Sequence, residues 1–162
     1  MNEIDLLLQT LDQAYDHKAW HGPNLKQALR GLKAEDAAWR PAEGRHNAWE
    51  LALHCAYWKY AAHSRILGLP SGRFAVKGRN FFPRPEGPPT DKAWKADLAL
   101  LEDYHRQLRE AVAALDPSRL DDKIKEWTFR ETILGVAMHD TYHGGQIQLL
   151  RRLRGEAESP ED

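Results

Sequence analysis

The sequence predicts an all-α protein, a four-helix bundle with a long connection between its second and third long helices. Three observations indicate this fold. Apolar residues recur every three or four positions in four long segments, the spacing at which one face of a helix is buried. No segment alternates between apolar and polar residues as a strand would. Residues 68–89, between the second and third segments, hold four Gly and five Pro, too many for a helix or a central strand.

The first helix should begin near Ile4 and continue to about Trp20. Its apolar positions keep spacings of three and four, and Gly22 with Pro23 then breaks the pattern. A short helical piece is expected over residues 24–32.

The second helix has a local start signal. Asn47 can accept hydrogen bonds from the backbone amides of the first turn while Glu50, three residues later, reciprocates. The helix should run to about Leu67, where Gly68 follows. Its inward stripe consists of Leu51, His54, Tyr57, Trp58 and Ala61.

Thr90 and Asp91 should cap the third helix, whose apolar residues then alternate by four and three until Pro117 ends it. Thr128 and Glu131 form the S/T-x-x-E box that starts the fourth helix, which should reach about residue 154. We therefore expect a single domain over residues 1–155. The acidic residues 156–162 are expected to be a frayed tail.

The long connection carries an unusual charge pattern. Arg73, Lys77 and Arg79 lie in it without any acidic residue between Arg65 and Arg84, and phenylalanines lie among them. One interpretation is a solvated loop that its phenylalanines hold in place. The other is a lid whose cations hold an anionic substrate.

Composition excludes several classes of protein. The 23 Lys and Arg against 24 Asp and Glu leave a formal charge of -1, so we expect no nucleic-acid partner. The apolar runs are too short to span a membrane. A single Cys cannot form an intrachain disulfide, and the first residues are acidic where a signal peptide would be basic. A cytoplasmic location is the expectation.

The strongest local signal is the pair His139 and His143 on the fourth helix. Residues four apart share one helix face, so both imidazoles can reach one cation. His54 lies in the inward stripe of the second helix. Three inward histidines predict a site for a divalent transition metal, with zinc or nickel favoured, that keeps an open coordination position. The alternative is that each is a hydrogen-bonded core histidine.

Three further residues could lie near this site. His105, on the third helix, could be a fourth ligand or a core histidine bonded to a neighbouring carbonyl. His63 lies about 180° from His54 around the helix axis and is not expected to join it. Cys55 should be a packed thiol.

The segment from His139 to His143 also matches H-E-x-x-H with Asp140 in place of glutamate, the residue that acts as general base in zinc hydrolases. Asp140 and Glu50 are therefore the candidate catalytic residues. A surface position, or a contact to a ligand histidine, is the alternative for Asp140.

Two segments, residues 135–147 and residues 49–58, resemble the DinB-like (YfiT-like) superfamily of metal-dependent proteins. The likeness extends to Trp20-His21-Gly22-Pro23 and to the start of the third helix, and so spans nearly the whole chain. It implies a four-helix bundle whose metal is held by one histidine of the second helix and two of the fourth. These positions are His54, His139 and His143 here.

The resemblance also implies a range of functions. Characterised relatives use low-molecular-weight thiols in S-transfer or isomerisation, which suggests a thiol-dependent metalloenzyme of S-transferase type acting on a small molecule. A metal-dependent hydrolase and a non-catalytic metal-binding or structural bundle are the alternatives, and a homodimer through helix faces is one further expectation. The residues expected to contact substrate are His21, Trp20, Trp58, Tyr142, Gln146, Arg73, Lys77 and Arg79. Trp20, Trp58 and Tyr142 are interpreted as water-excluding pocket walls, with core packing as the alternative.

Overall fold

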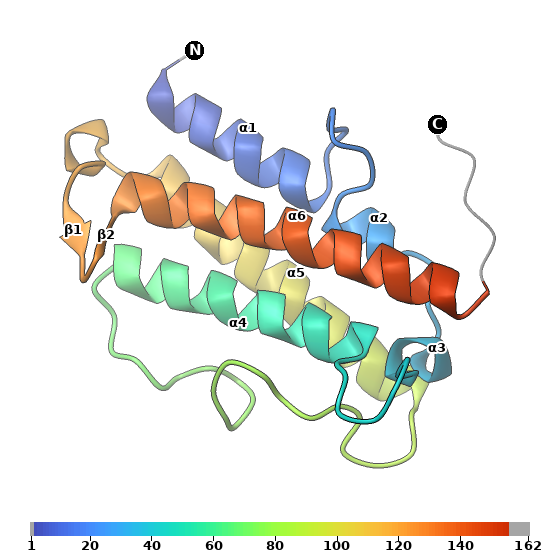
Figure 1. Ribbon diagram of the computed structural model, residues 1–162. Coiled ribbons are helices and arrows are strands. Elements are labelled where there is room, and N and C mark those ends of the chain that lie inside the picture. Colours follow the sequence, from blue (N-terminus) through green and yellow to red (C-terminus); the bar gives the residue numbers. More distant parts are fainter. Residues whose placement is uncertain (1, 156–162) are drawn as a thin grey trace.

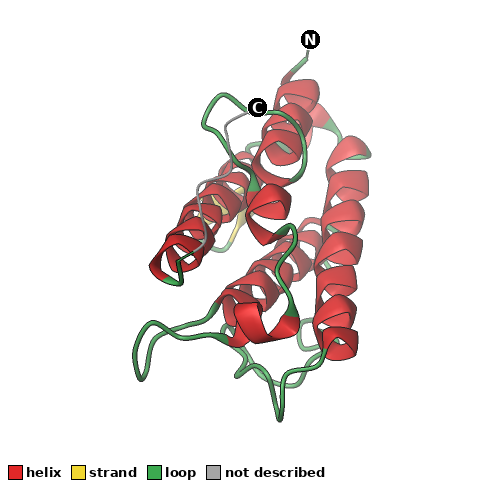
Figure 2. Ribbon diagram, turned by 90° about the vertical axis from the view of Figure 1, so that its right-hand side faces the viewer, coloured by secondary structure: helices red, strands yellow, loops and turns green. Residues whose placement is uncertain are grey.

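The computed structural model describes residues 2–155 and is all-α, as predicted, apart from one small hairpin (Figures 1 and 2). The helices are α1 (Glu3–Tyr15), α2 (Leu25–Leu29), α3 (Ala34–Ala38), α4 (Ala48–Ile66), α5 (Asp91–Ala113) and α6 (Phe129–Leu153). A 3-10 turn, η1 (Pro117–Arg119), precedes the antiparallel strands β1 (Lys123–Ile124) and β2 (Trp127–Thr128). The sequence did not predict this hairpin, because two residues per strand are too few to show an alternating pattern. The predicted acidic tail lies outside the described residues.

The four longest helices pack against one another. Helix α4 contacts α5 and α6, and α1 contacts α6 and α5, while the short helices α2 and α3 cover α6 and α4. Figure 1 shows α4 and α6 running side by side in opposite directions, with the hairpin beside the end of α4 and the start of α6. None of the described helices combines the length and the apolar composition needed to cross a membrane.

Most helix starts are those that the sequence predicts. The side chains of Asn47 and Thr90 accept hydrogen bonds from the third residue of α4 and α5, and Thr128 forms a complete capping box with Glu131. The expected reciprocal contact of Glu50 is absent, since its carboxylate binds other groups.

The expected end of the first helix was wrong. Helix α1 ends at Tyr15, and residues 16–24 form turns that lead into α2. Asn24 accounts for the early end. Its side-chain amide donates to the carbonyl of His17 at 2.9 Å, and its side-chain oxygen accepts from Gln27 N to start α2.

The apolar core consists of two clusters, one around Trp49 and Trp94 and the other around Leu108 and Ile133. On α4, α5 and α6, buried polar residues lie where one cluster gives way to the other. These residues are Lys59, His105, Asp140 and His143. A polar layer therefore divides the core, and the candidate site belongs to it.

The long loop, residues 67–90, runs back along α4 toward its N-terminus (Figure 1). Its contacts with α4 occur in reverse order along the helix, which fixes its direction. They join Arg73 N to Tyr60 Oη at 2.7 Å, Asn80 O to His54 Nδ1 at 2.8 Å, and Arg84 N to Glu50 Oε1 at 3.2 Å.

Candidate metal centre

The three predicted histidines converge in the structure. His54 comes from α4, and His139 and His143 come from successive turns of α6. The Nε2 atom of His139 lies 2.9 Å from Nε2 of His54 and 3.1 Å from Nε2 of His143. The predicted layer of three imidazoles is therefore present, and its three Nε2 atoms face one another.

Hydrogen bonds of the Nδ1 atoms, which point away from the centre of the triad, fix the tautomers of two of these histidines. Nδ1 of His54 contacts the carbonyl oxygen of Asn80 at 2.8 Å, and Nδ1 of His143 contacts Oε1 of Gln146 at 2.6 Å. Both partners are acceptors, so each Nδ1 must carry the proton and donate it. In the neutral imidazoles, the Nε2 atoms of His54 and His143 then present lone pairs to the centre.

This arrangement fits a divalent cation. Two inward lone pairs face Nε2 of His139, which can donate a single proton to one of them at most. A cation would satisfy all three nitrogens at once. Zinc–nitrogen bonds of about 2.0–2.1 Å in a tetrahedral site require ligand atoms about 3.3 Å apart, close to the observed separations.

Burial keeps the three imidazoles neutral, the form that binds metal. It lowers the pKa of His54 to about 4 and that of His139 to about 3, with further lowering from the neighbouring histidines. The pKa of His143 is also lowered by burial, although its hydrogen bond to Gln146 opposes the change. The neutral rings are therefore ready to coordinate at neutral pH.

The loop covers one side of the triad. The ring of Phe81 stacks on His54 with centroids 3.9 Å apart, and Asn80 accepts from Trp58 Nε1 through its side-chain oxygen at 3.0 Å. Asn80 adopts φ 70°, a left-handed conformation that asparagine tolerates better than most residues. Through its backbone carbonyl and its side chain, this one loop residue positions both a candidate ligand and the aromatic side chain beside it.

Asp140 is not a surface residue, so that alternative was wrong. It is fully buried because its side of α6 faces α4, where its carboxylate forms an ion pair with the equally buried Lys59. Burial raises the pKa of Asp140, and the Lys59 ammonium opposes this rise. Its second oxygen, Oδ1, has no hydrogen-bond partner, and neither does Nδ1 of His139. The Asp140 carboxylate lies in one cluster with Cys55 and His139.

Glu50, the other candidate base, is bound by three partners. Its carboxylate accepts from Arg40 Nη1 at 2.9 Å and from the backbone amide of Arg84 at 3.2 Å, and it lies 2.9 Å from Nδ1 of His46. These contacts lower its pKa against the effect of burial. The carboxylate therefore anchors the loop to the start of α4.

His105 and Cys55 are core residues. The ring of His105 stacks on Tyr15 with centroids 3.9 Å apart, and its Nδ1 lies 3.3 Å from Lys59 Nζ rather than near a carbonyl. It does not belong to the group of three histidines that could hold a metal ion. Cys55 is fully buried, which raises the pKa of its thiol well above the usual value, so it is a packed thiol as expected.

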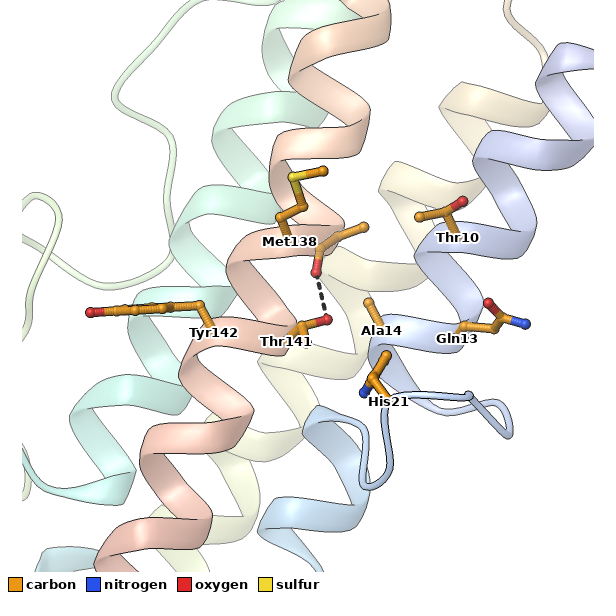
Figure 3. Close-up of a pocket in the computed structure, with 8 residues that line it drawn as sticks. Thr10, Gln13, Ala14, His21, Met138, Thr141 and Tyr142 are labelled. Atoms are coloured by element: carbon orange, nitrogen blue, oxygen red, sulfur yellow. Dashed lines mark hydrogen bonds between the residues drawn. The ribbon is translucent and has the colours of Figure 1, made fainter.

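The predicted substrate contacts are dispersed. Trp20 is fully exposed, so the prediction that it shields a pocket from water was wrong; α1 ends before it and leaves it in a turn. His21 lines a pocket of about 400 Å³ between α1 and α6 (Figure 3). The ring of Tyr142 points away from the α1 side of that pocket and lies 5.0 Å from the ring of His143. Tyr142 is 65% exposed, so the alternative that it packs in the core was wrong. Trp58 is half-buried beside His139.

The remaining predicted substrate contacts are Gln146 and the three cations of the loop. The amide oxygen of Gln146 binds His143, so this residue orients a candidate ligand. Arg73, Lys77 and Arg79 all lie exposed on the loop, and Arg79 directly precedes the Asn80 that contacts His54. Their predicted role in substrate binding stays a prediction.

Sequence reasoning missed Lys59 and Asn80. Lys59 is the single Lys, Arg, Asp or Glu between Leu51 and Ala62, and a lone charge in such an apolar stretch could have indicated a buried partner. Asn80 had no comparable signal, since its importance depends on the path of the loop.

One of three comparisons with known proteins identifies a family for this chain. Neither the curated proteins nor the solved structures include a significant match to the chain. The family model of the DinB superfamily matches residues 18–147, a span that includes all three histidines of the triad. The chain, with its histidine triad between α4 and α6, belongs to the DinB superfamily.

Proposed function

We propose that this protein is a metal-dependent enzyme that binds zinc or nickel through His54, His139 and His143 and activates a low-molecular-weight thiol for S-transfer. The convergence of three imidazole Nε2 atoms, two with inward lone pairs, is the observation that carries the proposal. Membership of the DinB superfamily supports it.

A divalent cation at this place would supply the positive charge that lowers the pKa of a bound thiol, so that the sulfur is nucleophilic at neutral pH. The protein's part is to present three neutral imidazoles in fixed tautomers. The carbonyl of Asn80 and the amide of Gln146 do this by holding the outer protons of His54 and His143. Three protein ligands leave a coordination position open for the thiol.

Other groups would bind and orient the reactants. Trp58 and Phe81 cover the triad and exclude water from it, and the cations of the loop would attract carboxylates of the thiol. In the reaction the sulfur forms a bond to an electrophilic carbon of the second substrate. The leaving group departs with its electron pair, and the thiol proton passes to solvent.

The two alternatives have less support. A hydrolase would need a free acid or base, but both candidates, Asp140 and Glu50, are held in ion pairs. A non-catalytic bundle would need no cavity at the triad. Instead, His139 lines a pocket of about 440 Å³, a volume suited to a small molecule.

Metal analysis tests the first half of the proposal. Purified protein loaded with Zn²⁺ or Ni²⁺ and then desalted should retain one ion per chain by plasma mass spectrometry. His54→Ala, His139→Ala and His143→Ala should each lose most of it. His63→Ala is the matched control, because His63 lies outside the triad. Full metal content in any of the three variants would exclude that residue as a ligand.

The second half is tested with thiols. Cysteine, glutathione and coenzyme A are each incubated with chlorodinitrobenzene and metal-loaded protein, and the conjugates are measured by mass spectrometry. Conjugation above the spontaneous rate should require both the metal and an intact triad. If no thiol gives a metal-dependent product with this or any other electrophile tried, the S-transfer proposal fails even though metal is bound.

A further inference from the structure

A pocket extends from His139 along the groove between α4 and α6. Its volume is about 440 Å³, and its lining includes Trp58, Arg65, Trp127, Leu134, Met138 and His139. The groove is lined by the last turns of α4, the first turns of α6 and Trp127 of the hairpin. A candidate metal ligand is therefore continuous with an apolar cavity.

The walls of this pocket are suited to an apolar body. The aromatic and aliphatic side chains provide most of the lining, and Trp127 and Met138 remain largely exposed in the free protein. Large apolar side chains exposed beside a polar, chemically competent group are typical of a small-molecule site. A bound molecule would cover them.

The charge in the pocket comes from Arg65. Its guanidinium lies over the ring of Trp58, 5.6 Å from the ring centroid, and it forms no ion pair with any carboxylate in residues 2–155. Glu131 also lines the pocket, but its carboxylate accepts from the backbone amide of Thr128 at 2.8 Å and from its hydroxyl at 2.9 Å. The cation is therefore the group left available to a ligand.

The side-chain contacts limit the length of that ligand. The ring centroids of Trp58 and His139 lie 6.3 Å apart, and the Arg65 guanidinium carbon lies 5.6 Å from the Trp58 ring centroid. The guanidinium is therefore no more than about 12 Å from the His139 ring, a span that a small organic molecule can cover.

We infer that the pocket binds the second substrate of the proposed reaction, an apolar or aromatic organic acid. Its body packs between Trp58 and Trp127, its carboxylate pairs with Arg65, and its reactive end lies at His139. This inference rests on the proposed function, because the reactive end is assigned from the triad. Guanidinium–carboxylate pairing and aromatic contact together define the substrate class.

Binding of three matched probes tests it. Phenylbutyrate, phenylbutanol and phenylbutylamine share one body and differ in the charge of the end group. Isothermal titration with EDTA-treated protein should show that the carboxylate binds at least about tenfold more tightly than the alcohol. Arg65→Gln should abolish that preference, and Trp127→Ala should weaken all three probes. Arg106→Gln, whose side chain pairs with Asp103 and Glu110 on the surface of α5, is the control and should behave as the parent.

The outcomes separate this inference from the proposed function. Equal binding of acid and alcohol, tighter binding of the amine, or an unchanged preference in Arg65→Gln would each overturn the substrate class. Because the titrations use metal-free protein, failure of metal binding or of thiol transfer leaves them unaffected. Repeating them with the parent protein in the presence of Zn²⁺ tests capture of the carboxylate by metal. A preference for the acid that is present without zinc and lost in Arg65→Gln supports the inference, and a preference that appears only with zinc overturns it.

Discussion

Lys59 has no contact with solvent, yet three groups surround its ammonium. Asp140 forms an ion pair with it, His105 Nδ1 lies 3.3 Å away, and the ring centroid of Tyr15 lies 4.8 Å away. Removing both charges from water is costly, and their attraction offsets this only while both partners are present. The pair should therefore respond very differently to single and double substitution.

Lys59→Met should destabilise the protein by about 3–5 kcal/mol, because it leaves the Asp140 carboxylate buried and unpaired. The double variant Lys59→Met with Asp140→Leu should recover most of this loss. Urea unfolding measures both values. Arg106→Ala, which breaks exposed pairs, should leave the free energy of unfolding nearly unchanged. A double variant as unstable as the single one would show that the pair itself stabilises the fold.

Gln146 should act on metal affinity with little effect on folding. Gln146→Leu removes the acceptor of His143 Nδ1, so zinc affinity should fall by about 10–100-fold in a competition titration with a coloured chelator. Gln146→Glu keeps an acceptor and should retain tight binding. Gln107→Leu, on α5, serves as the control. Parental affinity in Gln146→Leu would mean that α6 alone orients the ring.

Stability of the metal-free protein should fall as pH is lowered from 7 to 5. In the unfolded chain, histidines titrate near 6.5, whereas burial lowers the pKa of His54 to about 4 and that of His139 to about 3. Between these values the unfolded state binds more protons, so acid favours unfolding. Urea midpoints in EDTA at pH 7, 6 and 5 measure the decline. The fall of the urea midpoint with pH should be shallower in the double variant His54→Gln, His139→Gln. An equal fall in the parent and the variant would show that these two histidines do not cause it.

At the scale of elements, the sequence predicts those structural features that depend on residues close together in the chain. The caps at Asn47, Thr90 and Thr128 act within three residues, so they could be read from the chain. The triad was predictable for the same reason, because each histidine follows the periodicity of its own helix. The early end of α1, the exposure of Trp20 and the contact of Asn80 with His54 depend on distant segments, and no local pattern carries that information.

The loop offers an electrostatic test. Neutralising Arg73, Lys77 and Arg79 to Gln should weaken binding of an anionic thiol such as glutathione to the zinc-loaded protein. The loss should shrink as salt rises, because exposed charges are screened beyond about 8 Å at physiological ionic strength. Titration at low and high salt measures it, with metal content unchanged. If the triple variant binds glutathione as the parent does at low salt, the loop is only a covering connection.

At the scale of the whole molecule, the polar layer aligns three helices. Lys59 of α4, His105 of α5 and Asp140 of α6 meet between the two apolar clusters, and the triad lies next to them. Moving one helix by a turn would place an unpaired charge in an apolar cluster. The layer therefore favours one alignment of the bundle, and the geometry of the candidate metal site depends on that alignment.

Metal binding should stabilise the whole fold, because its ligands come from helices distant in sequence. Zinc at 100 times its dissociation constant adds about 2.7 kcal/mol, which for a chain of this size raises Tm by about 5–10 °C. Thermal scans with zinc and with EDTA measure the shift. His63→Ala should show the same rise and His139→Ala none. Identical Tm values with zinc and EDTA in the parent would contradict a folded-state site.

The anchoring of the loop has a consequence for where the chain tolerates extra length. Residues 70–72 are exposed and precede Arg73, whose backbone amide donates to Tyr60 Oη. An insertion at residues 70–72 therefore only lengthens an exposed part of the loop, at a small entropic cost. One residue added between Arg79 and Phe81 would advance the backbone by about 3.5 Å and take the Asn80 carbonyl away from His54. Reporter peptides or affinity tags can therefore be inserted in the first part of the loop, whereas its second half has a fixed length.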